Sequence, residues 1–497
     1  MVVHGDRAIA ERFDVVVVGS GAGGGLIAGE LAQRGRSVLL LELGEHRTAA
    51  DYARFEARAN RELWWPLTRA LPAVADGEPV TLFRGRCVGG GTTINTKVGL
   101  RAHAEDYAKW HDASGLLGAK GKPFAERDLL RYYERVEAAL GVRKRTDWQR
   151  CVRTVEPGFA ALGATLEPVD SYTDYNCMRC GSCLQGCPTN AGKGTLNVWI
   201  HPPWAQRRLE LRAGCEATRV LIDEVGVRPQ ARGVEYRDRS GALMQVEAGA
   251  VVAAAGTLAT PGLLLRSGIS EIAGESASAL QVGRNLGFHP SRLVFGLFDE
   301  IQDAHRVYPI TAHCMTHQLD ADGGFIVEAS TIMDPIAFAT SVCDERGQPL
   351  WGEELVSVMR DYRRFTGLLV MINDENNGAC SVGEDGGDAY SCNFSARERE
   401  RIAAGFEFTR GVLEAAGARR VLATQLFTTH VQGSCRMGSD RARSAVDANC
   451  ESHDVARLFV GDGSLVPRTL SVNPSLTIMA LALRLADHLD RGEHGYF

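Results

Sequence analysis

The clearest pattern of apolar and polar positions lies between residues 14 and 44. Residues 15–18 are four consecutive valines, a run typical of a strand that is buried on both faces. A segment with helical apolar periodicity follows, and a second apolar run at 38–41 ends in Glu42. Three glycines at G-x-G-x-x-G spacing open the helical segment: Gly19, Gly21 and Gly24. This order of strand, glycines, helix, strand and acid predicts a βαβ unit that binds a dinucleotide.

The residue types suit that role. A pyrophosphate can lie on a helix N-terminus only where no side chain blocks the backbone, which is why glycines are needed there. Glu42 follows about 20 residues after the glycines, where an acid that binds ribose is expected. A glycine-rich turn in an ordinary βαβ unit is the alternative interpretation.

Beyond this unit the pattern changes several times. Residues 85–102 contain three successive glycines before small hydroxyl residues, which indicates a backbone that passes close to another group rather than a flexible linker. Residues 124–140 have helical spacing, residues 209–248 alternate like a β-meander, and residues 251–268 predict a strand, a glycine turn and a helix. From 291 to 426, strands separated by acidic, glycine-rich loops predict a second domain on an antiparallel sheet.

Bulk properties are those of an ordinary soluble globular protein. The 497 residues suffice for two or three domains, and 45% of them are hydrophobic and 23% charged. The net charge of −6 argues against a nucleic-acid partner, which usually requires a basic face. The first 14 residues lack the apolar core of a signal peptide, and glycine and proline interrupt the longest apolar run. We therefore expect no transmembrane segment and a cytoplasmic location.

Five further motifs follow the N-terminal fingerprint along the chain. They are RGRCVGGGTTIN at 84–95, GTLATPGLLLRSGI at 256–269, VGRNLGFH at 282–289, HVQGSCRMG at 430–438 and NPSLTIMALALRLADHL at 473–489. Together they resemble the glucose–methanol–choline (GMC) family of flavin-dependent oxidoreductases. The similarity is weakest from 291 to 426, where we expect substrate choice to reside.

The resemblance implies an α/β fold, α+β overall, in which a split Rossmann-like FAD-binding domain is joined by a substrate domain with an antiparallel sheet. The implied units are a first FAD-binding part, a helical stretch with a cysteine-rich insert, a second FAD-binding part, the substrate domain and a C-terminal FAD-binding part. Their expected boundaries are 1–110, 111–200, 201–290, 291–426 and 427–497.

The resemblance also implies which residues bind FAD. The first three glycines approach the pyrophosphate and Glu42 the adenosine ribose. Gly89, Gly90 and Asn95 lie along the flavin and its ribityl chain, and the three C-terminal residues close the other side of the cofactor. The full set is Gly19, Gly21, Gly24, Glu42, Gly89, Gly90, Asn95, Asp462, Asn473 and Thr477. Some relatives attach FAD covalently through a histidine just before the asparagine that ends the motif at 84–95. This chain has Ile94 at that position, so we expect non-covalent FAD.

His430 and Asn473 are the catalytic residues that the resemblance implies. Oxidation of an alcohol requires a proton to leave oxygen while a hydride leaves carbon for the flavin. A neutral imidazole titrates near the working pH, and an amide can hydrogen-bond the same oxygen without competing for the proton. Three residues of the second domain are possible substrate contacts, although packed or solvated roles are the simpler interpretation: His313, His317 and Arg363.

Four of the 13 cysteines form the run C-x-x-C-x-x-C-x-x-x-C-P: Cys177, Cys180, Cys183 and Cys187. Bacterial ferredoxins use this run for iron–sulfur clusters. The offsets between the first, third and fourth cysteines also resemble those in bacterial FAD glucose dehydrogenase catalytic subunits, which carry a three-iron cluster. We therefore predict a 3Fe-4S or 4Fe-4S cluster, with structural zinc, disulfides or unligated thiols as alternatives. The other cysteines are scattered and predict small buried hydrophobic residues.

These features predict a FAD-dependent dehydrogenase that oxidises a small-molecule alcohol. Electrons would pass through the cluster to an external acceptor, either a protein or a quinone. An oxidase of the same fold, with oxygen as acceptor and structural cysteines, is the first alternative, because long-chain alcohol oxidases of the family also resemble the cysteine stretch. A non-redox lyase that keeps its FAD is the second.

Overall fold

The computed structural model describes most of the chain: residues 11–52, 55–72, 77–202, 205–224, 228–274, 276–329, 333–344, 347–491 and 495–497. Segment 1–10, most of the stretch in which we expect no signal peptide, lies outside the described residues. None of the described helices is both long and apolar enough to cross a membrane.

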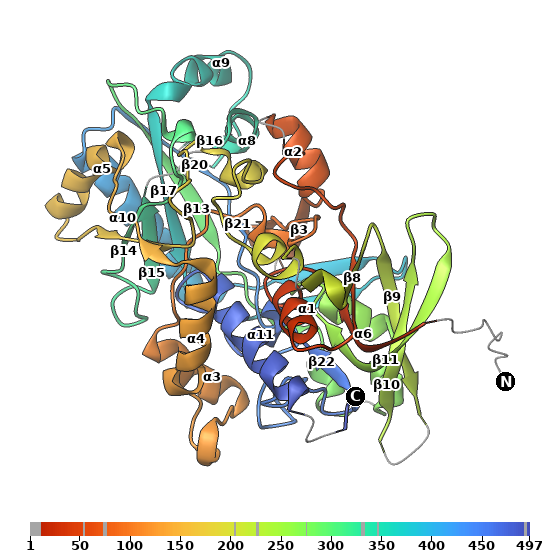
Figure 1. Ribbon diagram of the computed structural model, residues 1–497. Coiled ribbons are helices and arrows are strands. Elements are labelled where there is room, and N and C mark those ends of the chain that lie inside the picture. The colour runs from red at the N-terminus through yellow and green to blue at the C-terminus, as the bar shows by residue number, and fades with distance from the viewer. Residues whose placement is uncertain are drawn as a thin grey trace.

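The predicted βαβ unit lies at the centre of the first sheet (Figure 1). The strand order is β8 (Leu209–Ala213), β2 (Val38–Glu42), β1 (Arg12–Val18), β11 (Leu243–Ala253), β10 (Gln230–Arg237) and β9 (Glu216–Asp223), and β22 (Leu458–Val460) also pairs with β11. The pairs of β8 with β2, β2 with β1, β1 with β11 and β11 with β22 are parallel. This arrangement confirms the predicted Rossmann-like fold.

The β-meander predicted over residues 209–248 is only partly correct. Strands β9, β10 and β11 form an antiparallel meander, but β8 leaves it and pairs in parallel with β2 at the far edge of the sheet. Alternation of polar and apolar positions indicates a half-buried strand and does not reveal its partner. The partner of β8 is set by the long-range packing of the whole sheet.

The second sheet is largely antiparallel, as predicted. Its order is β12 (Arg284–Leu286), β18 (Gly378–Val382), β19 (Asp388–Cys392), β3 (Thr68–Pro72), β4 (Val80–Leu82), β21 (Phe427–Thr428), β13 (Ser291–Leu297), β17 (Phe365–Ile372), β15 (Phe325–Ala329), β14 (Ala312–Cys314) and β6 (Glu167–Pro168), with β20 (Arg420–Thr424) paired to β13 and to β16 (Val342–Cys343). Strands from several parts of the chain therefore join those of residues 291–426. A separate short ribbon pairs β5 (Arg143–Lys144) with β7 (Asp170–Ser171).

Helices cover both sheets and connect them. They are α1 (Gly24–Gln33), α2 (Glu56–Leu63), α3 (Ala104–Ser114), α4 (Glu126–Leu140), α5 (Arg150–Ala161), α6 (Thr260–Arg266), α7 (Ile269–Ile272), α8 (Pro335–Ser341), α9 (Gly352–Arg360), α10 (Ala396–Ala415) and α11 (Ser475–Asp490). The C-terminal α11 lies against α1 and α4, and α10 packs on the second sheet (Figure 1). Helix α4 confirms the helical spacing of residues 124–140.

Local sequence explains where α10 begins and α4 ends. The hydroxyl of Ser395 accepts a hydrogen bond of 3.1 Å from the backbone N–H of Glu398, whose carboxylate accepts one of 2.6 Å from the N–H of Ser395. This reciprocal capping satisfies two N–H groups that the helix leaves free. At the other boundary, Gly141 ends α4 with a φ of +65°, which glycine adopts without steric cost.

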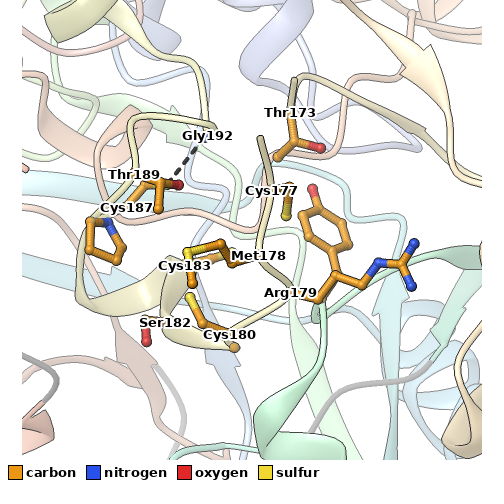
Figure 2. Close-up of a pocket in the computed structure, with 13 residues that line it drawn as sticks. Thr173, Cys177, Met178, Arg179, Cys180, Ser182, Cys183, Cys187, Thr189 and Gly192 are labelled. Atoms are coloured by element: carbon orange, nitrogen blue, oxygen red, sulfur yellow. Dashed lines mark hydrogen bonds between the residues drawn. The ribbon is translucent and has the colours of Figure 1, made fainter. Parts of the chain in front are cut away.

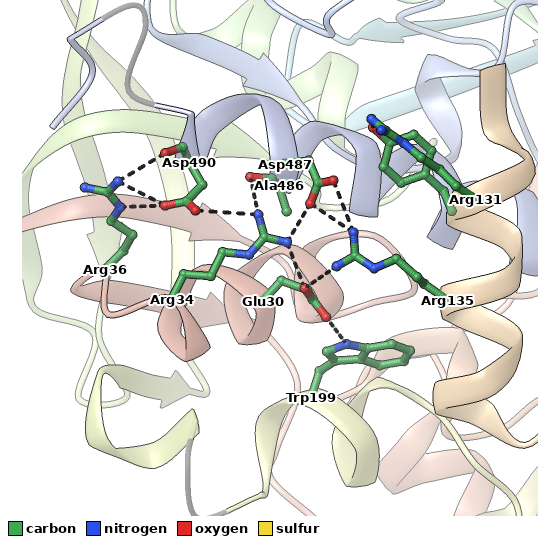
Figure 3. A network of polar contacts seen from close by, with 10 residues as sticks. Glu30, Arg34, Arg36, Arg131, Arg135, Trp199, Ala486, Asp487 and Asp490 are labelled. Atoms are coloured by element: carbon green, nitrogen blue, oxygen red, sulfur yellow. Dashed lines mark hydrogen bonds and ion pairs between the residues drawn. The ribbon is translucent and has the colours of Figure 1, made fainter.

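A network of charged groups joins α1, α4 and α11 (Figure 3). The guanidinium of Arg34 on α1 contacts Asp487 on α11 at 2.6 Å and Glu30 at 2.9 Å. Arg135 on α4 contacts the same two carboxylates at 3.1 and 3.2 Å. The indole N–H of Trp199 donates to Glu30 at 3.1 Å. Each carboxylate therefore lies between two arginines, which holds the first and the last helix together.

Candidate functional site

Gly19, Gly21 and Gly24 have different roles in the loop between β1 and α1. Gly19 has a φ of +98°, and a Cβ there would lie 2.2 Å from the carbonyl oxygen of Ala254. A Cβ on Gly24 would lie 2.0 Å from the carbonyl oxygen of Gly19. A Cβ on Gly21, by contrast, would meet no described protein atom within 4 Å. The fold itself requires the first and third glycines, whereas Gly21 presents bare backbone to open space, as an approaching phosphate needs.

Ser20, which the sequence analysis did not single out, connects this loop to Glu42 and Gly89. Its hydroxyl donates to a carboxylate oxygen of Glu42 at 2.6 Å and accepts from the N–H of Gly89 at 2.9 Å. The N–H of Gly44 donates to the other carboxylate oxygen at 2.7 Å. Burial raises the pKa of Glu42, while these donors favour its charged form. Three predicted cofactor segments therefore meet at one hydroxyl.

The glycine cluster at 89–91 lies against the first loop. Gly89 and Gly90 have φ values of +88° and +50°. A Cβ on Gly90 would lie 2.9 Å from the Cα of Gly21, so a side chain there would push the two loops apart. The close approach inferred from the sequence is thus the approach of one glycine loop to the other.

Asp462 and Thr477 use their side chains within the protein. The carboxylate of Asp462 accepts hydrogen bonds from the N–H of Gly256 at 2.8 Å and the hydroxyl of Thr260 at 2.6 Å, which ties the loop after β22 to α6. The N–H and hydroxyl of Ser464 donate to its other oxygen. The hydroxyl of Thr477 lies 2.8 Å from that of Tyr133.

Several features fit a bound dinucleotide with a polar ring system. Helices α1 and α11 both begin without a side-chain cap, so their first backbone N–H groups are left for a ligand. The Oδ1 atoms of Asn95 and Asn473 are buried and have no hydrogen-bond partner among the described residues. Buried polar atoms are almost always satisfied, so these two indicate a group that binds there.

His430 lies beside His289, a residue of the VGRNLGFH motif to which no role was assigned. Their Nδ1 atoms are 3.3 Å apart. His289 is completely buried, whereas His430 keeps part of its surface exposed. Burial nevertheless lowers the pKa of His430 to about 4, and it lowers that of His289 well below the ordinary value, with a smaller contribution from His430. Both imidazoles are therefore neutral at pH 7.

Asn473 has an unexpected neighbour in Glu328 on β15. Glu328 is completely buried, and burial raises the pKa of its carboxyl group to about 8, against a lowering influence of the Asn473 side chain. Neither carboxyl oxygen makes a hydrogen bond of ordinary geometry with a described residue. The sequence did contain a signal, because Glu328 is the one acid in the otherwise apolar strand FIVEA. Burial of an acidic side chain is costly, so an acid in a buried strand indicates a specific role.

The three possible substrate contacts have different environments. His313 on β14 is buried, and burial lowers the pKa of its imidazole to about 4. His317 stacks on Phe325 with ring centroids 4.8 Å apart. Arg363 forms an exposed ion pair of 2.7 Å with Asp303. The packed and solvated interpretations therefore hold for His317 and Arg363.

The four clustered cysteines line one pocket, which Figure 2 shows. All four are partly buried, and the nine scattered cysteines are buried, as predicted. Across the described chain, no three histidine, cysteine or acidic side chains are arranged to hold a metal ion. The thiol of Cys187 accepts a hydrogen bond of 3.2 Å from the N–H of Gly192. The motif thus brings the thiols to one pocket without gathering them around a single centre.

A buried lysine lies behind this pocket. Lys97 is 1% exposed, and its ammonium group donates to the carbonyl oxygen of Thr92. Burial lowers the pKa of Lys97 to about 8, against the opposing influence of Cys183 and Cys187. A positive charge in this position would favour negative charge on the neighbouring sulfur atoms.

Comparison with known proteins assigns the chain to a family. Models of the GMC oxidoreductase family match residues 13–291 and 385–482. The chain belongs to the GMC oxidoreductase family. It is accordingly a FAD-dependent oxidoreductase of the class that acts on CH–OH donors.

Proteins with several different activities in their names align with almost the whole of this GMC oxidoreductase. A long-chain-alcohol oxidase of Arabidopsis thaliana is 28% identical over 96% of this chain and 67% of its own length. An uncharacterized GMC-type oxidoreductase of Sinorhizobium fredii is 28% identical over 95% of this chain and 94% of its own. Among solved structures, pyridoxine 4-oxidase from Mesorbium loti has a TM-score of 0.71 at 21% identity, covering 96% of this chain and 99% of its own. This last likeness concerns the fold.

Proposed function

We propose that this enzyme oxidises an alcohol to a carbonyl compound, with His430 as the base and Asn473 as a hydrogen-bonding partner of the alcohol oxygen. The observation that carries the proposal is the state of His430. Its imidazole is partly exposed, and its pKa of about 4 keeps it neutral at physiological pH. A neutral imidazole can accept the hydroxyl proton as a hydride leaves the carbon.

Asn473 supports the proposal through its unpaired amide oxygen. The Oδ1 atom is buried and without a partner among the described residues, and the residue precedes α11, whose first N–H groups are uncapped. An amide there can fix the alcohol oxygen without taking up its proton. The N-terminus of α11 also favours negative charge that develops nearby.

The residues that would hold FAD follow from the contacts described above. Gly21 and the N-terminus of α1 would receive the pyrophosphate, and Glu42, fixed by Ser20, the adenosine ribose. Gly89, Gly90, Asn95 and the segment of Asn473 and Thr477 would face the flavin and its ribityl chain, with Asp462 holding the adjoining loop. When bound, FAD supplies the hydride acceptor. The division of the chain at 110, 200, 290 and 426 is part of the same proposal.

The electrons that leave the flavin could pass to an external protein or quinone, or to oxygen. The ferredoxin-like spacing, the shared pocket and the buried Lys97 support a cluster that relays electrons to an external protein or quinone. The dispersed arrangement of the four thiols supports the alternative, in which oxygen takes the electrons and the cysteines are structural. Because the thiols do not converge on one centre, we derive no electron path through this segment.

Two experiments test these proposals. Anaerobic addition of alcohols of graded chain length and polarity should bleach the flavin absorption band with at least one of them. A non-redox lyase would show no bleaching with any alcohol that it binds. Iron and acid-labile sulfide measured in protein prepared without air, together with the rate of peroxide formation, then distinguish the acceptors. Iron with sulfide supports the cluster, and rapid peroxide formation without iron supports the oxidase.

A further inference from the structure

The imidazoles of His430 and His289 form a pair. Their Nδ1 atoms are 3.3 Å apart, their ring centroids 5.3 Å apart, and their planes are inclined by 30°. No described residue makes a hydrogen bond with the Nε2 atom of either ring, and the Nε2 atom of His289 is fully buried. The contact between the two Nδ1 atoms is thus the hydrogen bond that joins the rings.

The backbone holds both rings in place. His289 has a φ of +49°, and its N–H donates to a carboxylate oxygen of Asp374 at 3.1 Å. The hydroxyl of Thr428 accepts from the N–H of His430 at 3.0 Å and donates to the carbonyl oxygen of Phe288. The two histidine-bearing segments are thus joined through one threonine. The fold therefore keeps the two histidines next to each other.

Two facing Nδ1 atoms require that one carries a proton and the other does not. A neutral imidazole has a single ring proton, so this choice fixes the tautomer of both rings. If His430 donates, its Nε2 atom keeps a lone pair and can act as a base. If His289 donates, the proton of His430 lies on Nε2, and that atom cannot accept another. Once His430 is protonated on both nitrogens, only the arrangement in which it donates is possible.

We infer that His289 is a positioning residue that accepts a hydrogen bond from the Nδ1–H group of His430 and thereby keeps the Nε2 atom of His430 free to take the alcohol proton. The inference rests on the proposed function of His430. In the reaction, Nε2 of His430 would take the hydroxyl proton, and FAD, when bound, would supply the acceptor for the hydride that leaves the carbon as the carbonyl compound forms. The protons on Nδ1 of His430 and on Nε2 of His289 stay where they are.

The surroundings do not favour a charged His289. The carboxylate of Asp374 lies beside the backbone of His289, but one of its oxygens accepts from the N–H groups of Phe288 and His289 and the other from the N–H of Asn376. Burial raises the pKa of Asp374, as it does that of Glu398 beside it. Neither carboxylate is hydrogen-bonded to an imidazole, so His289 remains a neutral partner when His430 takes up the proton.

Matched substitutions at position 289 test the inference. In His289→Asn, the amide oxygen Oδ1 can take the place of Nδ1 and accept the hydrogen bond. Asparagine also tolerates a positive φ. His289→Leu fills the space without an acceptor. We expect flavin reduction by a bleaching alcohol to slow about 10- to 100-fold in His289→Leu, the worth of a hydrogen bond to a charged group, and to stay within several-fold of native in His289→Asn. The pH at which reduction becomes half-maximal should fall in the leucine variant only.

A spectroscopic measurement covers the case in which His289→Leu does not fold. Nitrogen-15 NMR of histidine-labelled native holoenzyme should show His430 protonated at Nδ1 and unprotonated at Nε2, with its signals assigned through His430→Ala. The opposite tautomer would overturn the inference, as would a leucine variant with a native rate and pH profile. A native rate and pH profile in the leucine variant leaves the proposed function unaffected. That proposal fails instead if His430→Ala itself reduces its flavin at the native rate.

Discussion

Glu328 on β15 and His313 on β14 are paired directly across the two strands, and both side chains are buried. Directly paired residues point to the same face of a sheet, so an acid and a base lie side by side, with the Asn473 side chain next to the acid. Their pKa values of about 8 and about 4 nevertheless make both neutral at pH 7. Burial outweighs any attraction between them, and the pair is not a salt bridge.

Glu328→Gln should make the stability of the protein less dependent on pH. The folded pKa of Glu328 is raised from 4.5 to about 8. Its contribution is therefore most favourable below pH 4.5 and is lost as the pH rises toward 8, by at most about 1.4 kcal/mol per pH unit. Glutamine cannot ionise, so the variant should lose less stability over this window. Urea unfolding at pH 5 and pH 8 measures the difference, with the exposed Glu134→Gln as a control that behaves as native.

His430→Ala should fold, bind FAD and reduce it about 10²- to 10⁴-fold more slowly, because a positioned base is worth that much. Asn473→Ala should cost less if the amide only orients the alcohol oxygen. Anaerobic stopped-flow measurement of flavin bleaching gives both rates. His317→Ala is the control, since that ring packs on Phe325 and should leave the rate unchanged. A native rate in His430→Ala would move the role of base to another residue.

The sequence predicted what local pattern determines and missed what long-range packing determines. The unit from β1 to β2 was correct because strand, glycines and helix are contiguous. The partner of β8 was not, since alternation does not specify pairing. His289 stood inside a recognised motif, but its role depends on a contact with a ring 141 positions later. Glu328 was visible as one acid in an apolar strand, yet only the folded sheet brings it to Asn473.

FAD should be released completely when the protein is precipitated with acid. Ile94, which occupies the position of the linking histidine of some relatives, is 2% exposed and packs with Leu63 and Cys87. An aliphatic side chain has no group that could form a bond to the flavin. Absorbance of the supernatant and the pellet at the flavin band gives the result. A yellow pellet would show that another side chain forms a covalent bond.

Asp487→Asn should lower the free energy of unfolding by about 1 kcal/mol, at the upper end of the range for partly exposed ion pairs. The carboxylate lies between Arg34 and Arg135, and without its charge these two cations retain Glu30 and, at 3.8 Å from Arg34, Asp490. Because salt screens such interactions, the deficit should shrink at 1 M NaCl. Urea unfolding at low and high salt measures both effects. Glu300→Gln removes an exposed pair with Arg150 and should change neither value.

The close contact between Gly23 and the loop after β22 has a consequence for how the chain is made. A Cβ on Gly23 would lie 1.8 Å from the carbonyl oxygen of Gly461, so the first loop is complete only when this distant segment has closed over it. During synthesis, the apolar β1 and α1 are made well before β22 and α11, with which they pack. Contacts of such long sequence separation form late and leave early segments exposed to aggregation. The first loop therefore stays incomplete until the segment around Gly461 has folded onto it, and loss of α11 should affect folding before it affects catalysis.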